Sequence, residues 1–180
     1  MVLLYGGGHH RTPYTWDKER VSSYIRYVDT DNQSHWLFDS FLFLEIMDTG
    51  TGGANKMFAK GYNLESANQA DRTKLIDYYF QSETGIGALD ASVKEASAIL
   101  GTPRQKRQIV ISIPEPIVYQ HPEQASSSTK YWGKIDNQTL DFSNSADRIK
   151  ACKWYIDQVR AKFNEKNYQH VELAGFYWLA

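Results

Sequence analysis

The chain has 180 residues, and its 20 Lys and Arg nearly balance its 21 Asp and Glu, so the net charge is −1. Without surplus positive charge, nucleic acid and anionic membrane surfaces are poor candidate partners. No apolar run approaches the roughly 18 residues of a membrane span. The single cysteine, Cys152, excludes an internal disulfide and a Cys-rich zinc site. The length suits one globular domain.

Apolar periodicity predicts strands that alternate with helices. In chain order we expect strand Val2–Tyr5, helix Trp16–Ile25, strand Trp36–Ile46, helices around Leu75–Phe80 and Leu89–Leu100, strand Gln108–Ile113, helix Ser145–Glu165 and strand Val171–Leu179. The second of these strands is almost continuously apolar, which is typical of strands buried on both faces of a parallel sheet.

The helix predictions rest on spacing and on end signals. Ile149, Cys152, Ile156, Val159 and Phe163 line one face of the last helix, so Cys152 is expected to be a core residue. Gly101, with Pro103 just beyond it, is a typical helix stop. Residues 120–142 are polar and rich in serine, and we expect a loop that faces the ligand.

This order of elements predicts an α/β fold with right-handed crossovers and parallel strands. A complete (β/α)8 barrel needs about 250 residues. The sequence therefore leaves two alternatives, half of such a barrel or a small open doubly wound sheet. The run Val171–Ala180 is apolar and has no polar tail, which favours the half barrel. We expect residues 1–180 to form one incomplete domain that ends in strand four, with exposed edges that favour self-association.

In parallel α/β proteins, functional sites lie at the carboxyl ends of the strands. This rule selects Tyr5, His9, His10, Glu45, Asp48, Glu115, Tyr177 and Trp178. Glu45 shares a strand face with Asp39, Phe41 and Phe43, because side chains alternate along a strand. If that face points inward, Glu45 lies at the mouth as the candidate catalytic carboxyl group, and Asp39 lies near the bottom in a structural role.

The residues also suggest a class of substrate. Cleavage of a glycosidic bond needs two carboxyl groups about 5–9.5 Å apart, and Glu45, Asp48 and Glu115 are the candidates. The chain has 25 aromatic residues (5 Trp, 12 Tyr and 8 Phe), and Tyr5, Trp36, Tyr177 and Trp178 lie near predicted strand ends. Flat aromatic rings stack on sugar faces, so we expect a carbohydrate ligand that these side chains bind.

Other site chemistries fit less well. The adjacent His9 and His10 point apart in extended backbone and would not chelate one metal, so no metal and no cofactor is expected. The loop Gly50–Gly53 invites a nucleotide-binding alternative, but no predicted helix opens directly behind it to receive the phosphates.

Several stretches resemble a bacterial family, Domain of Unknown Function 4855. They are Leu3–Gly8, Trp36–Leu44, Ile111–Pro114, Leu140–Ser143, Lys153–Asp157 and Gly175–Trp178. The resemblance implies a glycoside-hydrolase-like barrel in secreted or surface proteins, and hence an extracytoplasmic location, although the N-terminal residues show no signal peptide. It also implies an acid/base residue after strand four, so this chain alone is expected to be inactive. The functional expectation is the N-terminal part of a glycoside hydrolase; the alternative is a non-catalytic glycan-binding or surface-interaction module.

Overall fold

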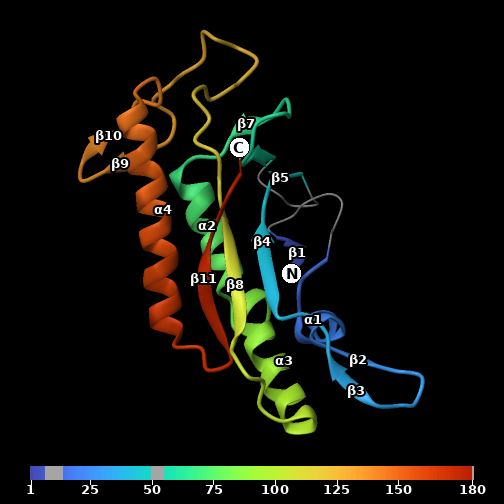
Figure 1. Ribbon diagram of the computed structural model, residues 1–180. Helices are drawn as coiled ribbons and strands as arrows, with labels where there is room; N and C mark the ends of the chain where they lie inside the picture. The colour runs from blue at the N-terminus through green and yellow to red at the C-terminus, as the bar shows by residue number, and fades with distance from the viewer. Residues whose placement is uncertain (7–13, 50–54, 180) are drawn as a thin grey trace.

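The structure is a computed structural model that describes residues 1–6, 14–49 and 55–179. These residues form a mixed α/β fold with one four-stranded parallel sheet and four helices (Figure 1). The sheet strands are β1 (Val2–Tyr5), β4 (Ser40–Leu44), β8 (Arg107–Ile113) and β11 (Val171–Trp178). The helices are α1 (Lys18–Ile25), α2 (Gln69–Tyr79), α3 (Gly85–Leu100) and α4 (Ser145–Lys166).

Shorter strands make three small sheets beside the main one. An antiparallel hairpin joins β2 (Arg26–Val28) and β3 (Ser34–Trp36), and a second joins β9 (Lys134–Ile135) and β10 (Gln138–Thr139). The third small sheet contains β5 (Met47–Asp48), β6 (Lys56–Met57) and β7 (Glu65–Ser66).

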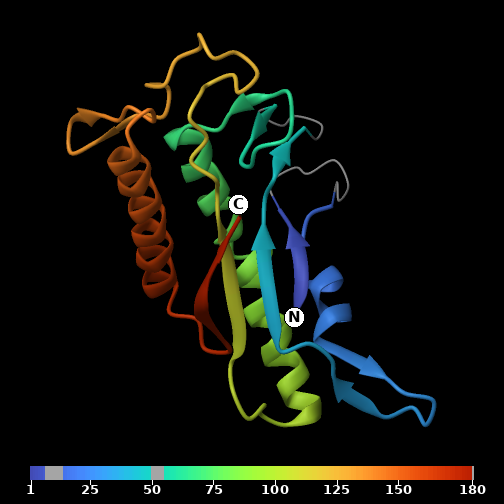
Figure 2. The same cartoon turned by 45° about the horizontal axis from the view of Figure 1, so that its top comes forward.

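The strands of the main sheet lie in the order β1-β4-β8-β11, which is also their order along the chain (Figure 2). Every neighbouring pair is parallel. Each connection between them contains at least one helix. Adjacent parallel strands require such crossovers, because the chain must return to the same end of the sheet. The predicted mixed α/β fold with a parallel sheet is therefore confirmed.

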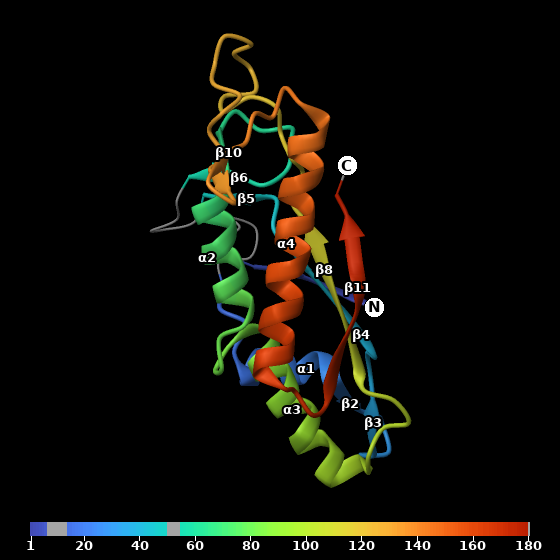
Figure 3. The ribbon, with the colours of Figure 1, turned by 90° about the vertical axis from the view of Figure 1, so that its left-hand side faces the viewer.

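All four helices pack on one face of the sheet (Figure 3). Alternate strand residues supply the sheet side of this core: Leu4, Phe41, Phe43, Ile109 and Ile111, each at most 1% exposed. Burial of an apolar side chain of this size stabilises a fold by about 1.5–3 kcal/mol. The shared apolar face thus explains both the strand order and the position of the helices.

The opposite face of the sheet carries no helix among the described residues. On this face the outer strands expose Leu3 of β1 and Tyr177 of β11, which are 39% and 45% exposed. Leu42 and Leu44 of β4 are buried between their neighbours. The two faces of the sheet therefore differ, one packed against the helices and one open at its margins.

The prediction of one strand over Trp36–Ile46 is wrong at its start. Trp36 instead ends β3, where it pairs with Arg26 in the antiparallel hairpin. Asp29 holds the turn of that hairpin, because its Oδ1 accepts hydrogen bonds from the backbone N–H of Asp31 and of Gln33. Three residues then lead to the first residue of β4, so the apolar run covers two separate strands.

The segment 120–142 is more ordered than the predicted loop. It contains β9 and β10, and its side chains Trp132, Leu140 and Phe142 form a small buried cluster with Ala151 of α4. Phe142 N–H also donates to the carbonyl of Thr129. A separate apolar cluster thus fixes this segment against α4.

The junction between α2 and α3 depends on glycine. Gly85 begins α3 with a φ of 56°, a left-handed conformation that glycine adopts without strain. A Cβ at Gly87 would lie 2.4 Å from the carbonyl oxygen of Gln81 and 2.5 Å from that of Ser82. The first turn of α3 therefore packs directly on the backbone that leads into it.

We expect Gly87→Ala to destabilise the fold by at least about 1 kcal/mol, because the backbone around Gln81 has to move to admit a methyl group. Urea unfolding monitored by circular dichroism measures the change. Gly175→Ala is the control: a Cβ there meets nothing within 4 Å, so its effect should stay within about 0.5 kcal/mol. Equal stability of the two variants would contradict the packing argument.

Candidate functional site

The carboxyl ends of the four parallel strands lie at one edge of the sheet. Six of the residues predicted from sequence are at or just beyond these ends: Tyr5, Glu45, Asp48, Glu115, Tyr177 and Trp178. Trp36 is not among them. His9, His10 and the loop Gly50–Gly53 lie outside the described residues.

Glu45 is the most unusual group at this edge. It follows the last residue of β4 and is 1% exposed. Its Oε1 accepts hydrogen bonds from the backbone N–H of Ile46 at 2.9 Å and of Met47 at 3.1 Å. Its Oε2 is buried and has no hydrogen-bond partner among the described residues.

Burial raises the pKa of Glu45 from 4.5 to about 9, against the two backbone hydrogen bonds, which favour the ionised form. The nearby charge of Asp48 adds a smaller upward shift of the pKa. At neutral pH the side chain is therefore a protonated acid, which can donate a hydrogen bond or a proton through its second oxygen.

The surroundings of Glu45 identify its side of the sheet. Phe41 and Phe43 belong to the core under the helices, so the face that they share points toward the helices and not inward. Tyr79 of α2 packs edge-to-face on Phe43, at 5.4 Å between ring centroids. Burial raises the pKa of Tyr79 well above its usual value, and Tyr155 and Glu45 contribute to this shift. Glu45 thus lies near the buried side chain of Tyr79, on the helix side of the sheet.

Glu115 and Asp48 are built into the loops of this edge. Glu115 follows β8, and its Oε2 accepts the backbone N–H of Lys60 at 2.7 Å. Its carbonyl oxygen accepts a hydrogen bond from Nη2 of Arg72 at 2.8 Å. Asp48 ends β5 and is half-buried opposite Lys56. Of the three candidate carboxyl groups, Glu45 is the fully buried one, whereas Asp48 and Glu115 are half-buried.

Arg72 is a residue that the sequence prediction missed. It lies on α2, is 3% exposed and shares the interior with Tyr155, and burial lowers its pKa. Its bond to the carbonyl of Glu115 ties α2 to the loop after β8. An arginine among polar helix residues carries no sequence signal that distinguishes a buried anchor from a solvated side chain.

The aromatic side chains at the carboxyl edge differ in exposure. Tyr5 is half-buried, and its carbonyl oxygen accepts the indole N–H of Trp16. Tyr177 and Trp178 are 45% and 54% exposed at the end of β11. Because successive strand residues point to opposite faces, Tyr177 lies on the open face of the sheet. It is opposite Ser112 of β8 there.

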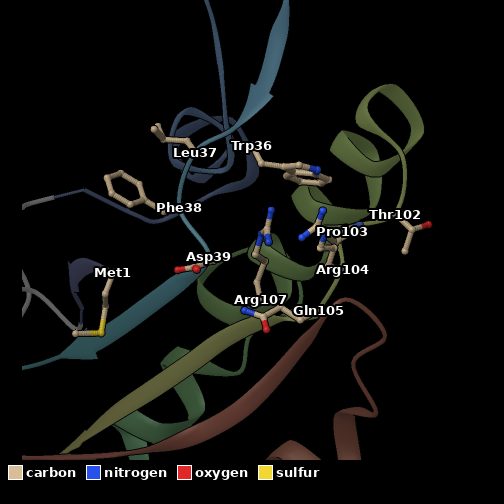
Figure 4. Close-up of a pocket in the computed structure, with 10 residues that line it drawn as sticks. All are labelled: Met1, Trp36, Leu37, Phe38, Asp39, Thr102, Pro103, Arg104, Gln105 and Arg107. Carbon is tan, nitrogen blue, oxygen red and sulfur yellow. The ribbon is translucent and has the colours of Figure 1, made fainter.

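Trp36 lies at the other edge of the sheet, before β4 begins. There its ring covers the guanidinium of Arg107, at 4.3 Å from Cζ to the ring centroid. Both side chains line a surface hollow of about 680 Å³ at this amino edge (Figure 4). The carboxyl and amino edges are therefore two separate candidate sites.

Two classes of feature are absent from the described part of the chain. No group of three or more His, Cys, Asp or Glu side chains there could hold a metal ion. None of the helices described is both long and apolar enough to cross a membrane.

The chain belongs to the family described as Domain of unknown function (DUF4855), whose model matches residues 1–180. The family resemblance seen in the sequence is thereby confirmed. Neither the curated proteins nor the solved structures give a match.

The raised pKa of Glu45 predicts that stability falls as pH rises. Between pH 4.5, where glutamate ionises in the unfolded chain, and about pH 9, only the unfolded state releases the proton. Unfolding is then favoured by up to about 1.4 kcal/mol per pH unit. Glu45→Gln removes this contribution, because an amide does not ionise.

Urea unfolding of both proteins at about pH 5.5, 7 and 8.5 measures the effect. The stability of the natural protein relative to the variant should decrease at each step. Parallel pH profiles would show that Glu45 ionises normally.

Proposed function

We propose that this DUF4855 member is a carbohydrate-active domain and that residues 1–180 form the first four βα units of a glycoside-hydrolase-like (β/α)8 barrel. Strand order that follows chain order supports this, because a doubly wound sheet reverses its order at a switch point. Helices on one face only also support it, since barrel helices form an outer ring. In this proposal, further βα units of the barrel pair with the outer edges of β1 and β11. Where those units are lacking, a second copy of the chain pairs with these edges.

One observation carries the functional part of the proposal: a buried carboxyl group with a raised pKa at the carboxyl edge. Glycosidic bond cleavage requires an acid that protonates the leaving oxygen, and that acid must keep its proton at the working pH. Glu45, with a pKa of about 9, meets this requirement, and the residue expected after strand four would supply the second carboxyl group. Its unpartnered Oε2 is the oxygen from which a proton could be delivered.

The burial of Glu45 adds a condition to this mechanism. Glu45 lies on the helix side of the sheet and is 1% exposed, so a bound glycan has to displace the adjacent residues that cover it. The backbone N–H groups of Ile46 and Met47 hold the other oxygen in place. The protein thus positions the carboxyl group through its own backbone, and the substrate supplies the energy of opening.

We expect Glu45→Gln to lower glycan hydrolysis by about 10²–10⁴-fold without unfolding the protein. The amide oxygen can still accept both backbone hydrogen bonds, but the side chain has no acidic proton. Turnover is measured with the full-length natural protein on a panel of glycans, and circular dichroism checks the fold. Glu115→Gln is the control, since the Glu115 side chain accepts a hydrogen bond from the loop backbone at Lys60. Undiminished turnover in Glu45→Gln would remove Glu45 from the mechanism.

A non-catalytic glycan-binding module is the second candidate, and the exposure of Tyr177 and Trp178 favours it. Exposed aromatic rings at a strand end can stack on a sugar without any carboxyl pair. This candidate predicts saturable binding without released product, whereas the enzyme releases reducing ends.

Under either candidate we expect Tyr177→Ala to weaken glycan binding by about threefold to tenfold, the effect of losing one stacking contact. The matched control is Tyr27→Ala, because Tyr27 has the same exposed fraction of 45% and lies on the distant β2–β3 hairpin. Calorimetric titration with the best-binding glycan of the panel measures both. Equal losses in the two variants would argue against a site at the carboxyl edge.

The family resemblance also leads us to propose an extracytoplasmic or cell-surface location. Fractionation of the native cells, with detection of the full-length protein by antibody, tests this directly. Recovery only with the cytoplasm would overturn it.

A further inference from the structure

The hollow at the amino edge lies at the opposite end of the sheet from Glu45. Residues 36–39, which precede β4, and residues 102–105, which precede β8, form most of it. Met1 and Arg107, the first residue of β8, complete the lining. Its volume is about 680 Å³, enough for a small ligand. It is open to solvent, and the carboxyl-edge proposal makes no use of it.

Arg107 is the buried charge of this hollow. The residue is 5% exposed, and its Nε has no hydrogen-bond partner among the described residues. Its guanidinium makes no hydrogen bond or ion pair with any other residue that the structure describes, and it lies against the ring of Trp36. A guanidinium keeps its charge at any physiological pH, so burial without a counter-ion is unfavourable.

The nearest candidate counter-ion is directed elsewhere. Asp39 attracts Arg107 only through space, and its Oδ1 accepts the hydroxyl of Ser40 at 2.8 Å. Figure 4 shows the carboxyl group of Asp39 turned away from the guanidinium. The donors of Arg107 therefore remain available on the side of the hollow.

A second arginine faces the same space. In Figure 4 the side chain of Arg104 extends beneath Trp36, as that of Arg107 does, and Arg104 is exposed. With Asp39 as the only acidic residue that lines the hollow, its charged side chains sum to 2 − 1 = +1 among the described residues. The two positively charged guanidinium groups at this hollow repel each other unless an anion lies between them.

We propose that the amino-edge hollow binds an oxyanionic group of a small ligand, with Arg107 as the buried donor and Arg104 as the exposed one. Planar guanidinium groups match the paired oxygens of a carboxylate or a phosphate. Trp36 holds Arg107 in position from above, because a cation is attracted to the face of an indole ring. The site is independent of the carbohydrate proposal, since it uses no residue of the carboxyl edge.

Isothermal titration with three probes tests this site: inorganic phosphate, glucuronate as a carboxylate and glucose as a neutral control, all at constant ionic strength. We expect saturable binding of at least one anion and none of glucose, with NMR shifts at the Trp36 indole N–H. Binding of phosphate alone identifies a phosphorylated ligand, and binding of glucuronate alone identifies a carboxylate. Binding of both identifies a site for either oxyanion.

Variants locate the binding. Arg104→Gln should raise the dissociation constant about tenfold, and Arg107→Gln should abolish binding. Arg160→Gln is the control, because Arg160 is an exposed arginine that also lies over an aromatic ring, that of Phe176. If Arg107→Gln fails to fold, the dissociation constant of Arg104→Gln alone tests the proposal. No saturable anion binding, or unchanged affinity in Arg104→Gln, would overturn the proposal.

Discussion

Burial of one apolar face of a parallel sheet is the constraint on which the rest of this structure depends. Phe41, Phe43, Ile109 and Ile111 alternate along the two central strands and meet all four helices on the same side. Parallel pairing requires a crossover in each connection, each crossover here contains a helix, and the buried face determines where those helices lie. The candidate sites follow from this arrangement, because it collects strand beginnings at one edge and strand endings at the other.

Each of the two edges has one buried ionisable side chain, and the two side chains differ in charge. At the carboxyl edge, Glu45 can take up a proton, and its raised pKa shows that the buried form is neutral. At the amino edge, Arg107 stays charged, because a guanidinium does not lose its proton in a protein. Its guanidinium lies against the face of Trp36 and lines an open hollow. A buried acid therefore points to proton chemistry, and a buried arginine points to a bound anion.

The elements with strong periodicity could be predicted from sequence, and those set by long-range contacts could not. Leu89, Val93 and Ala96 define α3 by their spacing, and Gly101 ends it at a φ of 78°. Trp36 was misassigned because an apolar run does not show where one strand stops and the next begins. Its true partner, Arg26, lies across a turn. The strand-end rule selected Glu45 correctly as a residue of the carboxyl edge, but its side of the sheet depended on which face the helices cover. Arg72 and Arg107 became visible only when burial was known.

The buried carboxyl group also affects the heat of folding. At neutral pH the unfolded chain holds Glu45 as a carboxylate, so each molecule that folds removes about one proton from the buffer. The enthalpy of unfolding measured by calorimetry then includes the ionisation heat of that buffer. Phosphate and Tris differ strongly in this heat, so the same protein would yield two apparent enthalpies, and their difference would count the protons exchanged.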